Sequence, residues 1–382
     1  MTPLFQQIVQ VLRADLESGR IASGGRLPSE NELARHFRVS RITAKKALDE
    51  LAYAGLVKRI QGKGTFALSL DGPAHKRHRA DPMIGFLLPD FSEPYGLELL
   101  HAIEAQTQNV GAHLIIKRTF DSAERETNAI QALLRLKVQG LIVFPVHGEH
   151  YNPELLKLVL DGFPVVLVDR YLRGIPACSV FTDNRDAAAA LTAHVLKQGC
   201  RHVAFASPPV EHTSAIEDRL LGLETTLARR GLVPEGRLAL YSSLPGPHAD
   251  EVHNDELRVR QFVLDHPDLD AFVTSEYNLA VVVTQALAAA GKRVPEDVAV
   301  ACFDAPAQPL QPSLFTHIQQ AETAMGRRAV ELLALQLEGE RVALEHPLPF
   351  TLIEGRSTRR QPLQGNPLVN SIAALESSPR PS

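Results

Sequence analysis

The sequence has little cysteine, no long apolar run and no secretion signal. Three widely spaced cysteines occur in 382 residues, and each lies in or beside an apolar, strand-like run. Buried reduced thiols therefore explain Cys178, Cys200 and Cys302 better than a disulfide framework does. No stretch of about 18 apolar residues is free of charge, Pro or Gly, and polar and acidic residues interrupt the apolar pattern of the N-terminus. We therefore expect no membrane span, no signal peptide and a cytoplasmic location.

Motifs for catalysis and for cofactor binding are also missing. No Gly-rich phosphate loop follows a strand-like run, and no nucleophile elbow occurs. The pair His147 and His150 follows the run GLIVFP, but no third metal ligand is spaced nearby. We expect a solvated loop there, no catalytic residues, no metal site and no cofactor.

The charge is distributed unevenly along an otherwise ordinary globular composition, 45% hydrophobic and 22% charged. The length suits roughly two or three compact units. Residues 1–79 contain 14 Lys and Arg against 7 Asp and Glu, which leaves 26 against 37 for the remainder. A small basic module on an acidic body favours a polyanion as the partner of the first module only. Nucleic acid is the leading candidate.

The first seventy residues predict three helices followed by a hairpin. Apolar residues at helical spacing between Pro3 and Gly19 predict the first helix. Ser29 and Glu32 form a capping box that starts a second, short helix ending at Phe37.

The third predicted helix runs from Arg41 to Ala54 and follows a tight turn at residues 39–40. We expect Ile42, Leu48 and Leu51 to face the core, while the polar side chains project outward. Two helices joined by a short turn, the second of them basic, form a helix-turn-helix pattern. Two short strands, residues 56–60 and 65–67, follow with a glycine-containing hairpin tip between them.

The pattern stops between Leu68 and Pro82, where the Gly, Pro and basic content is typical of an exposed connector. From Met83 onward, unbroken apolar runs alternate with helical patterns as far as a long helix near residues 322–338. This alternation indicates βαβ units and parallel sheets covered on both faces, and about 270 residues of it suggest two such sheets. The last segment lacks clear periodicity and is expected to be a disordered tail.

Two segments carry resemblances to known families. Residues 26–67, RLPSENELARHFRVSRITAKKALDELAYAGLVKRIQGKGTFA, closely resemble the winged-helix DNA-binding domain of GntR-family regulators. Residues 83 to about 356 resemble the effector domain of LacI/GalR regulators and periplasmic sugar-binding proteins. That second resemblance is carried in order by PDFSEPYGLELLHAIE, TDN, RLLG at 219–222, GKRVPEDVAVACFDA and LFTHIQQ. The whole chain is similar to arabinose-repressor-like regulators, although the helix that LacI-type proteins place between head and body is not evident.

The resemblance implies a winged helix-turn-helix domain over residues 1–68, a linker over 69–82 and a disordered tail over 357–382. Between them, residues 83–356 would form an α/β effector domain of two parallel-sheet lobes, of the periplasmic binding protein type I kind. It implies no enzyme but a repressor of carbohydrate-utilisation genes, released from double-stranded operator DNA by a sugar or sugar derivative and acting as a homodimer. The alternatives are a cytoplasmic sugar-binding protein without a regulatory role and a regulator that senses a nucleoside or another non-sugar ligand.

DNA binding needs cations for phosphates and forked donors for base edges. Arg41 and Lys45 lie one turn apart on the recognition helix and share a face with that capability. The resemblance places a larger set of positions against the duplex: Arg26, Ser29, Ser40, Arg41, Thr43, Lys45, Lys46, Gln61, Gly62, Lys63 and Gly64. A simpler alternative is a solvated helix face and a hairpin closed by its glycines.

Ligands of open α/β sheets bind beyond the carboxyl ends of the strands, and two facing lobes make that place a cleft. The candidates that follow strand-like runs are Asp90, Phe91, Tyr95, Asp169, Arg170, Glu276 and Asp304. The resemblance supports the first loop and Asp304, and it adds Arg219 from the Arg-x-x-Gly pattern. Glu276-Tyr277 replaces the family's usual Asn-Asp, so the familiar sugar contacts are not implied there. Simpler roles remain open: a helix cap for Asp90 or Asp183, an acidic partner for Arg219, and a core position for Tyr95.

Overall fold

The computed structural model describes residues 4–53, 56–60, 64–68, 82–146, 151–209, 213–242, 249–306 and 313–358. The chain forms two compact units, Met1–Pro82 and Met83–Ser382, which we call the head and the body. The expected wing tip (61–63), the histidine loop (147–150), most of the linker (69–81) and the chain beyond residue 358 lie outside the described residues.

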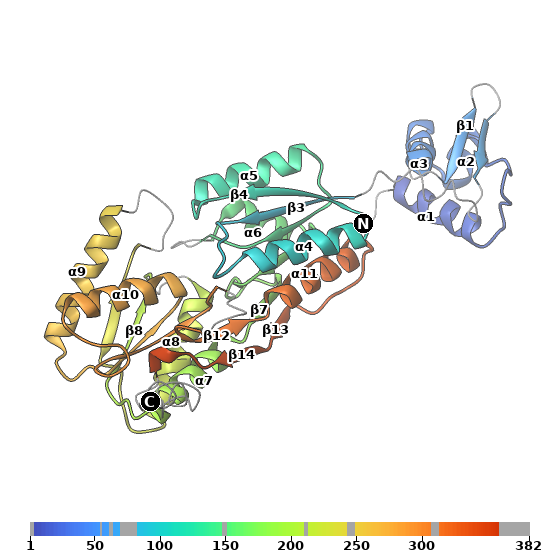
Figure 1. The fold of residues 1–382 in the computed structure, drawn as a ribbon. Helices are drawn as coiled ribbons and strands as arrows, with labels where there is room; N and C mark the ends of the chain where they lie inside the picture. The colour runs from blue at the N-terminus through green and yellow to red at the C-terminus, as the bar shows by residue number, and fades with distance from the viewer. Residues whose placement is uncertain are drawn as a thin grey trace, which may run out of the picture. The chain divides into compact units, whose positions relative to one another are not determined.

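The head consists of three helices and a hairpin (Figure 1). These elements are α1 (Leu4–Glu17), α2 (Glu30–Phe37), α3 (Arg41–Tyr53), β1 (Val57–Ile60) and β2 (Gly64–Ala67), with β1 and β2 antiparallel. The predicted capping box starts α2, because Ser29 Oγ accepts a hydrogen bond from Glu32 N at 3.4 Å and Glu32 Oε2 accepts one from Ser29 N at 2.7 Å. Apolar side chains of all three helices then close one small core.

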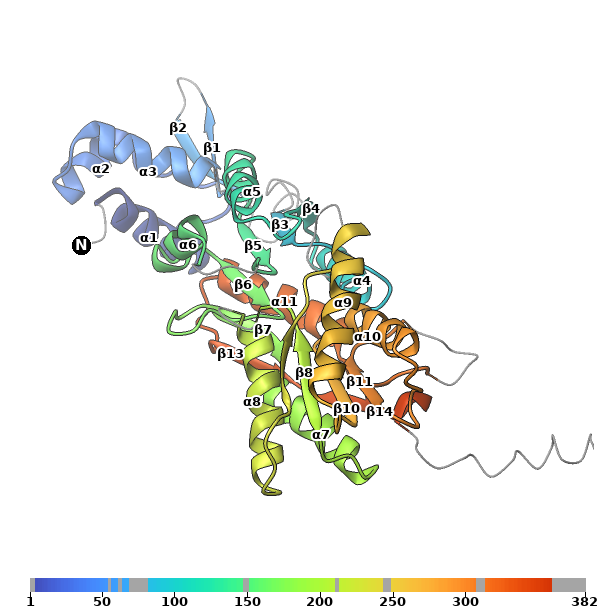
Figure 2. The same ribbon diagram turned by 90° about the vertical axis from the view of Figure 1, so that its left-hand side faces the viewer.

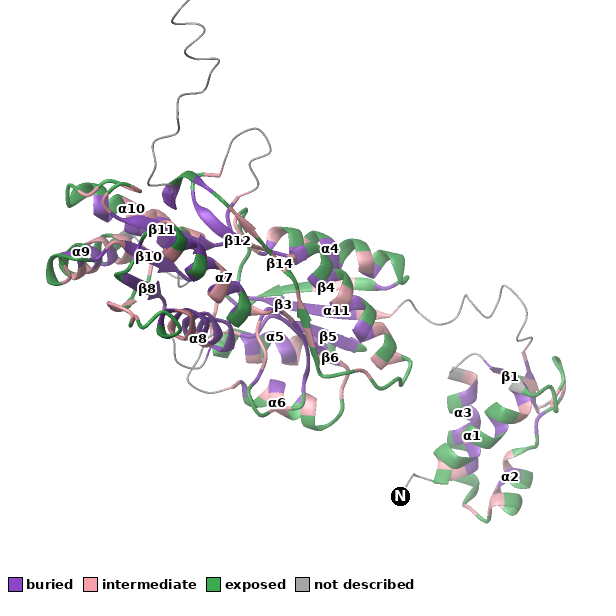
Figure 3. Cartoon of the chain, turned by 90° about the horizontal axis from the view of Figure 1, so that it is seen from below, coloured by how far each residue is buried: buried purple, intermediate pink, exposed green. Residues whose placement is uncertain are grey.

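The prediction that Ile42 faces the core is wrong. Its side chain is 79% exposed, whereas Ala44, Ala47, Leu48 and Leu51 form the buried stripe of α3 (Figure 3). At about 100° per residue, Ile42 lies roughly 200° around the helix from Ala44 and so points away from the core. A large apolar side chain therefore stands on the outer face of α3, next to Arg41.

Lobe 1 of the body is a parallel sheet with the strand order β13-β7-β6-β5-β3-β4. The strands are β3 (Met83–Leu88), β4 (His113–Arg118), β5 (Gly140–Val143), β6 (Val165–Val168), β7 (Cys178–Thr182) and β13 (Glu345–Leu348). The helices α4 (Leu97–Asn109) and α11 (Glu322–Leu337) cover one face. The helices α5 (Ala123–Arg135) and α6 (Pro153–Leu160) cover the other. Burial on both faces explains why these strands read as unbroken apolar runs.

Lobe 2 repeats the plan with the order β14-β12-β11-β10-β8-β9. Its strands are β8 (Val203–Ser207), β9 (Gly236–Ala239), β10 (Ala271–Thr274), β11 (Ala299–Phe303), β12 (Thr316–Gln320) and β14 (Phe350–Ile353). The helices α7 (Asn184–Lys197) and α8 (Ser214–Ala228) cover one face, and α9 (Ala249–Asp265) and α10 (Tyr277–Ala289) the other. Among the described strands of this sheet, β14 pairs antiparallel and the rest pair parallel.

The chain crosses between the lobes after β7, after β12 and after β13 (Figure 2). Residues that follow central strands of both lobes line one cavity, so the carboxyl ends of these strands border one cleft. The predicted fold class, two parallel-sheet lobes behind a small helical domain with a hairpin, is confirmed.

The body ends later than the sequence suggested. The expected tail starts at residue 357, but Ser357 and Thr358 are buried in a one-turn 3-10 helix, η1 (Arg356–Thr358). Thr358 Oγ1 lies 2.7 Å from Thr316 Oγ1 and 2.9 Å from His194 Nε2. These buried polar contacts tie the segment to lobe 2, because leaving such groups unpaired would cost free energy.

The three cysteines are buried thiols and not parts of disulfides, as predicted. Within the described parts of the chain, no helix combines the length and the apolar character needed to cross a membrane.

Candidate functional site

A cavity of about 90 Å³ lies between the two lobes of the body. Lobe 1 contributes Tyr95, Phe144, Asp169 and Arg170. Lobe 2 contributes Thr213, Arg219, Ser275, Glu276, Asp304 and Gln320, together with the apolar side chains Pro208, Ala215 and Ile216. Six of the eight residues expected at an effector site therefore line one cavity.

Each lobe presents one aspartate to the cavity by the same backbone arrangement. Asp169 follows β6 with a φ of 67°, and Asp304 follows β11 with a φ of 62°. Asp169 N donates to Val180 O at 2.9 Å, and Asp304 N donates to Ile318 O at 2.8 Å. A left-handed conformation costs a residue other than glycine about 1–3 kcal/mol and is concentrated at functional sites. The backbone hydrogen bond to the neighbouring strand holds each aspartate in this strained conformation.

Asp304 is buried beside a cation. Burial raises the pKa of its carboxyl well above the usual range, while the nearby charge of Arg219 opposes that rise. Gln320 Nε2 donates to both carboxylate oxygens, at 3.2 and 2.9 Å. The Asp304 carboxylate is therefore fixed in orientation from its own lobe.

Arg219 is held on three sides. Its Nε donates to Asn184 Oδ1 at 2.7 Å, and its Nη1 donates to Ser275 O at 2.6 Å. The guanidinium also lies 3.9 Å from the centre of the Phe303 ring. This arginine supplies a fixed positive charge at the cavity wall, held by the bonds from its Nε and Nη1.

The lobe 1 wall is similarly ordered. The Tyr95 hydroxyl donates to Asp169 Oδ1 at 2.5 Å, and burial raises the pKa of Tyr95 well above its usual value, so it remains a neutral donor. Arg170 Nη1 donates to Pro145 O at 2.7 Å, and its guanidinium lies 4.8 Å from the Phe144 ring centre. Arg170 Nε is also 3.5 Å from Asp169 Oδ2.

Two buried polar atoms of cavity-lining residues have no hydrogen-bond partner among the described residues: Ser275 Oγ and Gln320 Oε1. Buried polar atoms are nearly always satisfied in folded proteins, so such exceptions call for an explanation. Together with the two aspartates, these atoms offer an ordered set of acceptors and a hydroxyl donor to a small ligand rich in hydroxyl groups.

Residues adjacent in sequence to the cavity-lining Arg170 and Thr213 form a direct link between the lobes. Tyr171, in the loop after β6, donates its N–H to Ser214 Oγ at 3.0 Å and its hydroxyl to Asp218 Oδ2 at 2.7 Å. Arg173 donates to Asp218 Oδ1 at 2.9 Å and pairs with Glu217 at 2.7 Å. We call these five residues the latch, because they join a lobe 1 loop to α8 of lobe 2.

Two expected residues lie outside the cavity. Asp90 Oδ1 accepts a hydrogen bond from Arg118 Nη2 at 2.7 Å, and the Arg118 guanidinium lies 5.6 Å from the Phe91 ring centre. The edge strand β4 thus draws both side chains away from the cleft. Tyr277 also turns elsewhere: its ring packs edge-on against Phe315, with 5.6 Å between the centres.

Seven cavity residues were missing from the sequence-based set: the apolar Pro208, Ala215 and Ile216, and also Phe144, Thr213, Ser275 and Gln320. Phe144 and Ser275 directly follow the apolar runs GLIV and AFVT, so the strand-end rule could have found them. Gln320 ends a strand whose alternating polar residues hid it, and Thr213 carries no local signal. Asp183 has the simpler role that was left open, since it caps α7 by accepting from Asp186 N at 3.1 Å.

The head carries a second candidate site, a groove of about 520 Å³ between α2, α3 and the hairpin. Three arginines line it: Arg26, Arg41 and Arg59. Glu30 lies among them, 3.0 Å from Arg41 Nε and also paired with Arg59. The hydrogen bond from Arg41 is the largest influence lowering the pKa of Glu30. The groove therefore has a net positive charge and one internal counter-ion.

The hairpin lies directly against one of these arginines. At Gly64, with a φ of 119°, an added Cβ would lie 2.9 Å from Arg26 Nε. Glycine thus lets the side chain of Arg26 approach the base of the expected wing, and the two predicted DNA-contact positions meet. The tip itself, Gln61, Gly62 and Lys63, is outside the described residues.

The start of α3 is exposed and ordered. Ser40 Oγ accepts from Thr43 N at 3.1 Å and lies 2.8 Å from Thr43 Oγ1. Arg41 and Lys45 are exposed on the same helix. Lys46 instead places its Nζ 4.0 Å from the Phe5 ring centre, which attaches it to α1. The Ser29 side chain is likewise occupied in its capping box.

Comparison with known families matches both units. Residues 4–67 match the bacterial regulatory proteins of the gntR family. Residues 192–358 match the periplasmic binding protein-like domain, which covers lobe 2 and part of lobe 1. The head is thus a DNA-binding domain of the gntR kind, and the body has a ligand-binding fold, as the sequence resemblance implied.

Curated relatives match this chain over most of their length. The chain is 27% identical over 349 residues to the arabinose metabolism transcriptional repressor of Geobacillus stearothermophilus, covering 88% of this chain and 92% of that one. It is 27% identical over 339 residues to the ribose operon repressor of Halalkalibacterium halodurans, covering 86% and 96%. These relatives are transcriptional repressors and not enzymes.

Among solved structures, the lac repressor dimer bound to operator and the anti-inducer ONPF aligns with a TM-score of 0.61. The alignment covers 74% of this chain and 96% of the other at 18% identity, so it shows a shared fold alone.

Proposed function

We propose that this transcriptional regulator, in which a gntR-family DNA-binding domain is joined to a periplasmic-binding-protein-like domain, represses genes of carbohydrate use. In this proposal a small sugar binds in the cavity between the lobes and releases the head from its operator. The observation that carries it is the set of cavity groups, two aspartates and two unpartnered buried polar atoms, contributed by both lobes. The names of the arabinose and ribose repressors support the ligand class.

The charges of the cavity favour an uncharged sugar over a sugar acid or a sugar phosphate. Asp169, Glu276 and Asp304 supply carboxyl groups to the wall, and both arginines already have protein partners. Carboxylates accept strong hydrogen bonds from hydroxyl groups, whereas an anionic ligand would meet like charges in a low-dielectric site. An aromatic ring such as Phe144 can pack on the apolar face of a sugar ring.

The cavity is too small for a sugar in the state described. Its volume of about 90 Å³ is well below the roughly 300–1,000 Å³ of typical ligand pockets. A sugar must therefore separate the lobes at least partly, and the latch must yield during binding and release. If the latch has different geometries with and without the sugar, sugar binding can change the relative orientation of the lobes.

Release of DNA follows if the chain acts in the cytoplasm as a two-fold homodimer on a pseudo-palindromic operator. Movement of the lobes would then shift the dimer interface and change the spacing of the two heads, so that they no longer fit both half-sites. Sugar and operator would weaken each other by the same factor. Detection of monomers alone on the operator would contradict this mechanism.

The head would contact DNA through those predicted DNA-contact residues that line the groove or are exposed on α3. Among them, Arg41 would read a base edge in the major groove. Replacing Arg41 by Ala should abolish operator preference, because the variant lacks the forked donor that reads the base edge. Arg20→Ala is the matched control, because this exposed arginine of the head pairs with Asp15 and lies outside the predicted DNA-contact set, and it should change operator preference little. Unchanged preference in the Arg41 variant would refute the base-reading role.

The deciding experiment combines a thermal-shift screen with operator gel shifts. The panel contains arabinose, ribose, hexoses, sugar phosphates and nucleosides, and a ligand at 100 times its Kd should stabilise the protein by ~2.7 kcal/mol. We expect a neutral sugar to bind and to dissociate the operator complex. Asp169→Asn should lose this response, while Asp90→Asn, also at a lobe 1 strand end but outside the cavity, should keep it. A nucleoside as the sole ligand would favour the second candidate function, and sugar binding without operator binding would favour a sugar-binding protein that regulates nothing.

A further inference from the structure

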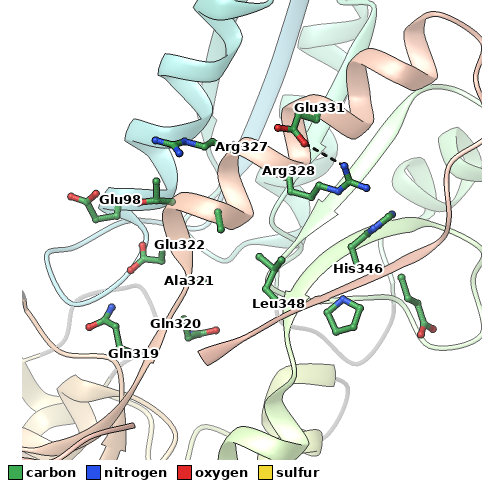
Figure 4. A pocket seen from close by; sticks show the side chains of 14 residues that line it. Glu98, Gln319, Gln320, Ala321, Glu322, Arg327, Arg328, Glu331, His346 and Leu348 are labelled. Carbon is green, nitrogen blue, oxygen red and sulfur yellow. Dashed lines mark hydrogen bonds and ion pairs between the residues drawn. The ribbon is translucent and has the colours of Figure 1, made fainter. Parts of the chain in front are cut away.

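The crossover from β12 to α11 joins the lobes through Gln320, Ala321 and Glu322. Gln320 is the last residue of β12 in lobe 2, and Glu322 is the first residue of α11 in lobe 1. The crossover borders a groove of about 820 Å³, and Figure 4 shows Glu322 at the start of α11 beside the helix that carries Glu98. Both Gln320 and Glu322 are buried, at 4% and 5% exposure. Buried polar groups are costly unless they are bonded, so their partners indicate what they do.

Glu322 caps a helix to which it does not belong. Its Oε2 accepts hydrogen bonds from Gly96 N at 2.7 Å and from Leu99 N at 3.3 Å. Gly96 is the N-cap of α4 and has no side chain to offer, and Leu99 is the third residue of that helix. These are the two N–H groups that a capping box normally satisfies within one segment. The carboxylate also lies where the helix dipole favours negative charge.

The capped turn leads directly to the cavity. Tyr95 precedes the capped residue, lines the cavity and donates its hydroxyl to Asp169 Oδ1. The α4–α11 contact leaves little freedom, because a Cβ added to Gly326 would lie 2.9 Å from Leu99 O. The first turn of α11 thus fixes where α4 begins and where the Tyr95 ring lies.

We propose that Glu322 is a positioning residue of the effector site, whose carboxylate holds the first turn of α4 and so Tyr95, and whose protonation lowers effector affinity. On the other side of Ala321, Gln320 holds the Asp304 carboxylate. A rotation of the lobes about this crossover therefore acts on both walls of the cavity. The inference rests on the proposed function for the identity of the cavity as an effector site.

The titration of Glu322 lies in the physiological range. Burial is the largest influence and raises its pKa to about 7, against the opposing effect of the two backbone N–H groups. Groups that face it or share its groove come from several elements: Tyr95 and Glu98 at the start of α4, Asp169 after β6, Asp304 after β11, Arg327, Arg328 and Glu331 on α11, and Glu345 and His346 on β13. An ionised carboxylate accepts stronger hydrogen bonds than a protonated one, so the cap is strongest above pH 7 and weakens as the pH falls through it.

The positioning role is tested without any ligand by ¹⁹F NMR of the full-length protein labelled with 3-fluorotyrosine. The chain contains six tyrosines, and Tyr95→Phe assigns the signal of interest. Between about pH 6 and pH 8 we expect the Tyr95 signal to move with a midpoint near the pKa of Glu322. It should not move in Glu322→Gln, while Glu331→Gln, on the same helix and groove, should behave like the wild type. A stationary signal in the wild type, or an unchanged titration in Glu322→Gln, would overturn the proposal.

The consequence for binding is tested by calorimetry with arabinose and ribose as the probes. The wild type should bind severalfold more weakly near the acid end of this range than near the alkaline end. Glu322→Gln should lose this pH dependence of the sugar affinity and bind roughly fivefold more weakly than the wild type at the alkaline end, as expected for one hydrogen bond. Glu322→Asp should recover part of the pH dependence. Equal affinities and equal pH profiles in all three proteins would overturn the proposal. If neither sugar binds, the sugar assignment fails, and the ¹⁹F titration still decides the role of Glu322.

Discussion

Replacing Arg219 by Met removes a buried charge while keeping an unbranched, although shorter, apolar side chain. The change deletes two short hydrogen bonds from a charged donor and leaves Asn184 Oδ1 and Ser275 O without that partner. Hydrogen bonds to charged groups contribute about 1.5–3 kcal/mol each. Two such bonds set the expected loss, about 4 kcal/mol of unfolding free energy for the body.

The loss should depend on pH because of Asp304. An acid whose pKa is raised on folding contributes stability that is present at low pH and is lost as the pH rises through its folded value. Arg219 limits that rise, so without it the pKa of Asp304 increases further. At acid pH the carboxyl is neutral in both proteins, and the variant should lose only its hydrogen bonds. The destabilisation should therefore grow as the pH increases.

The measurement is urea denaturation followed by far-ultraviolet circular dichroism, with the transition of the body compared at acid and at neutral pH. Arg173→Met is the matched control, because its guanidinium is 46% exposed in the latch, and such partly solvated pairs contribute about 0–1 kcal/mol. A loss below about 1.5 kcal/mol for Arg219→Met at neutral pH, or a loss that does not grow with pH, would refute the reasoning.

Three further variants test the head and the latch. Ile42→Ala should leave the stability of the head unchanged, because the Ile42 side chain is exposed. If that side chain contacts a thymine methyl group, the variant should bind the operator roughly fivefold more weakly, with the same dependence of affinity on salt. Equal operator affinity of variant and wild type in filter binding would exclude the contact. Glu30→Gln should release Arg41 from its ion pair with Glu30. The affinity for random DNA should then rise about threefold, because one negative charge is removed from a groove expected to bind phosphates. Tighter binding to the operator alone would contradict this explanation. Arg173→Ala should speed sugar dissociation severalfold with little effect on the association rate, because the substitution breaks the latch of the closed lobes. Dissociation rates equal to those of the wild type in stopped-flow experiments would show that the latch does not control sugar release.

Local sequence signals predicted much of the fold. The capping box at Ser29 and Glu32 formed as expected, because its hydrogen bonds join residues three apart. Apolar runs such as GLIV and AVACF became strands buried on both faces. Elements with mixed polarity were missed, including β9 and β12, whose exposed or alternating positions dilute the apolar signal.

The candidate site was predicted in part for the same reason. Asp169 and Asp304 each end an apolar strand, so a rule about strand ends found them. The same rule selected Asp90, whose carboxylate is instead engaged by Arg118 on the neighbouring edge strand. Periodicity cannot distinguish these cases, because the competing partner lies 28 residues away in the sequence. The exposure of Ile42 was misjudged because an apolar residue near a helix start fits two faces until the packing of the other helices is known.

The sequence by itself determined that a small basic helix-turn-helix module precedes a longer body of alternating strands and helices, because charge, capping and periodicity act over a few residues. Only the tertiary structure decided which strand ends meet across the cleft, since strand order and the three crossovers place β6 and β11 at one cavity. It also decided that Glu322 caps a helix 226 residues away. A buried carboxylate takes whichever donors the packing brings to it, and no local pattern records that choice.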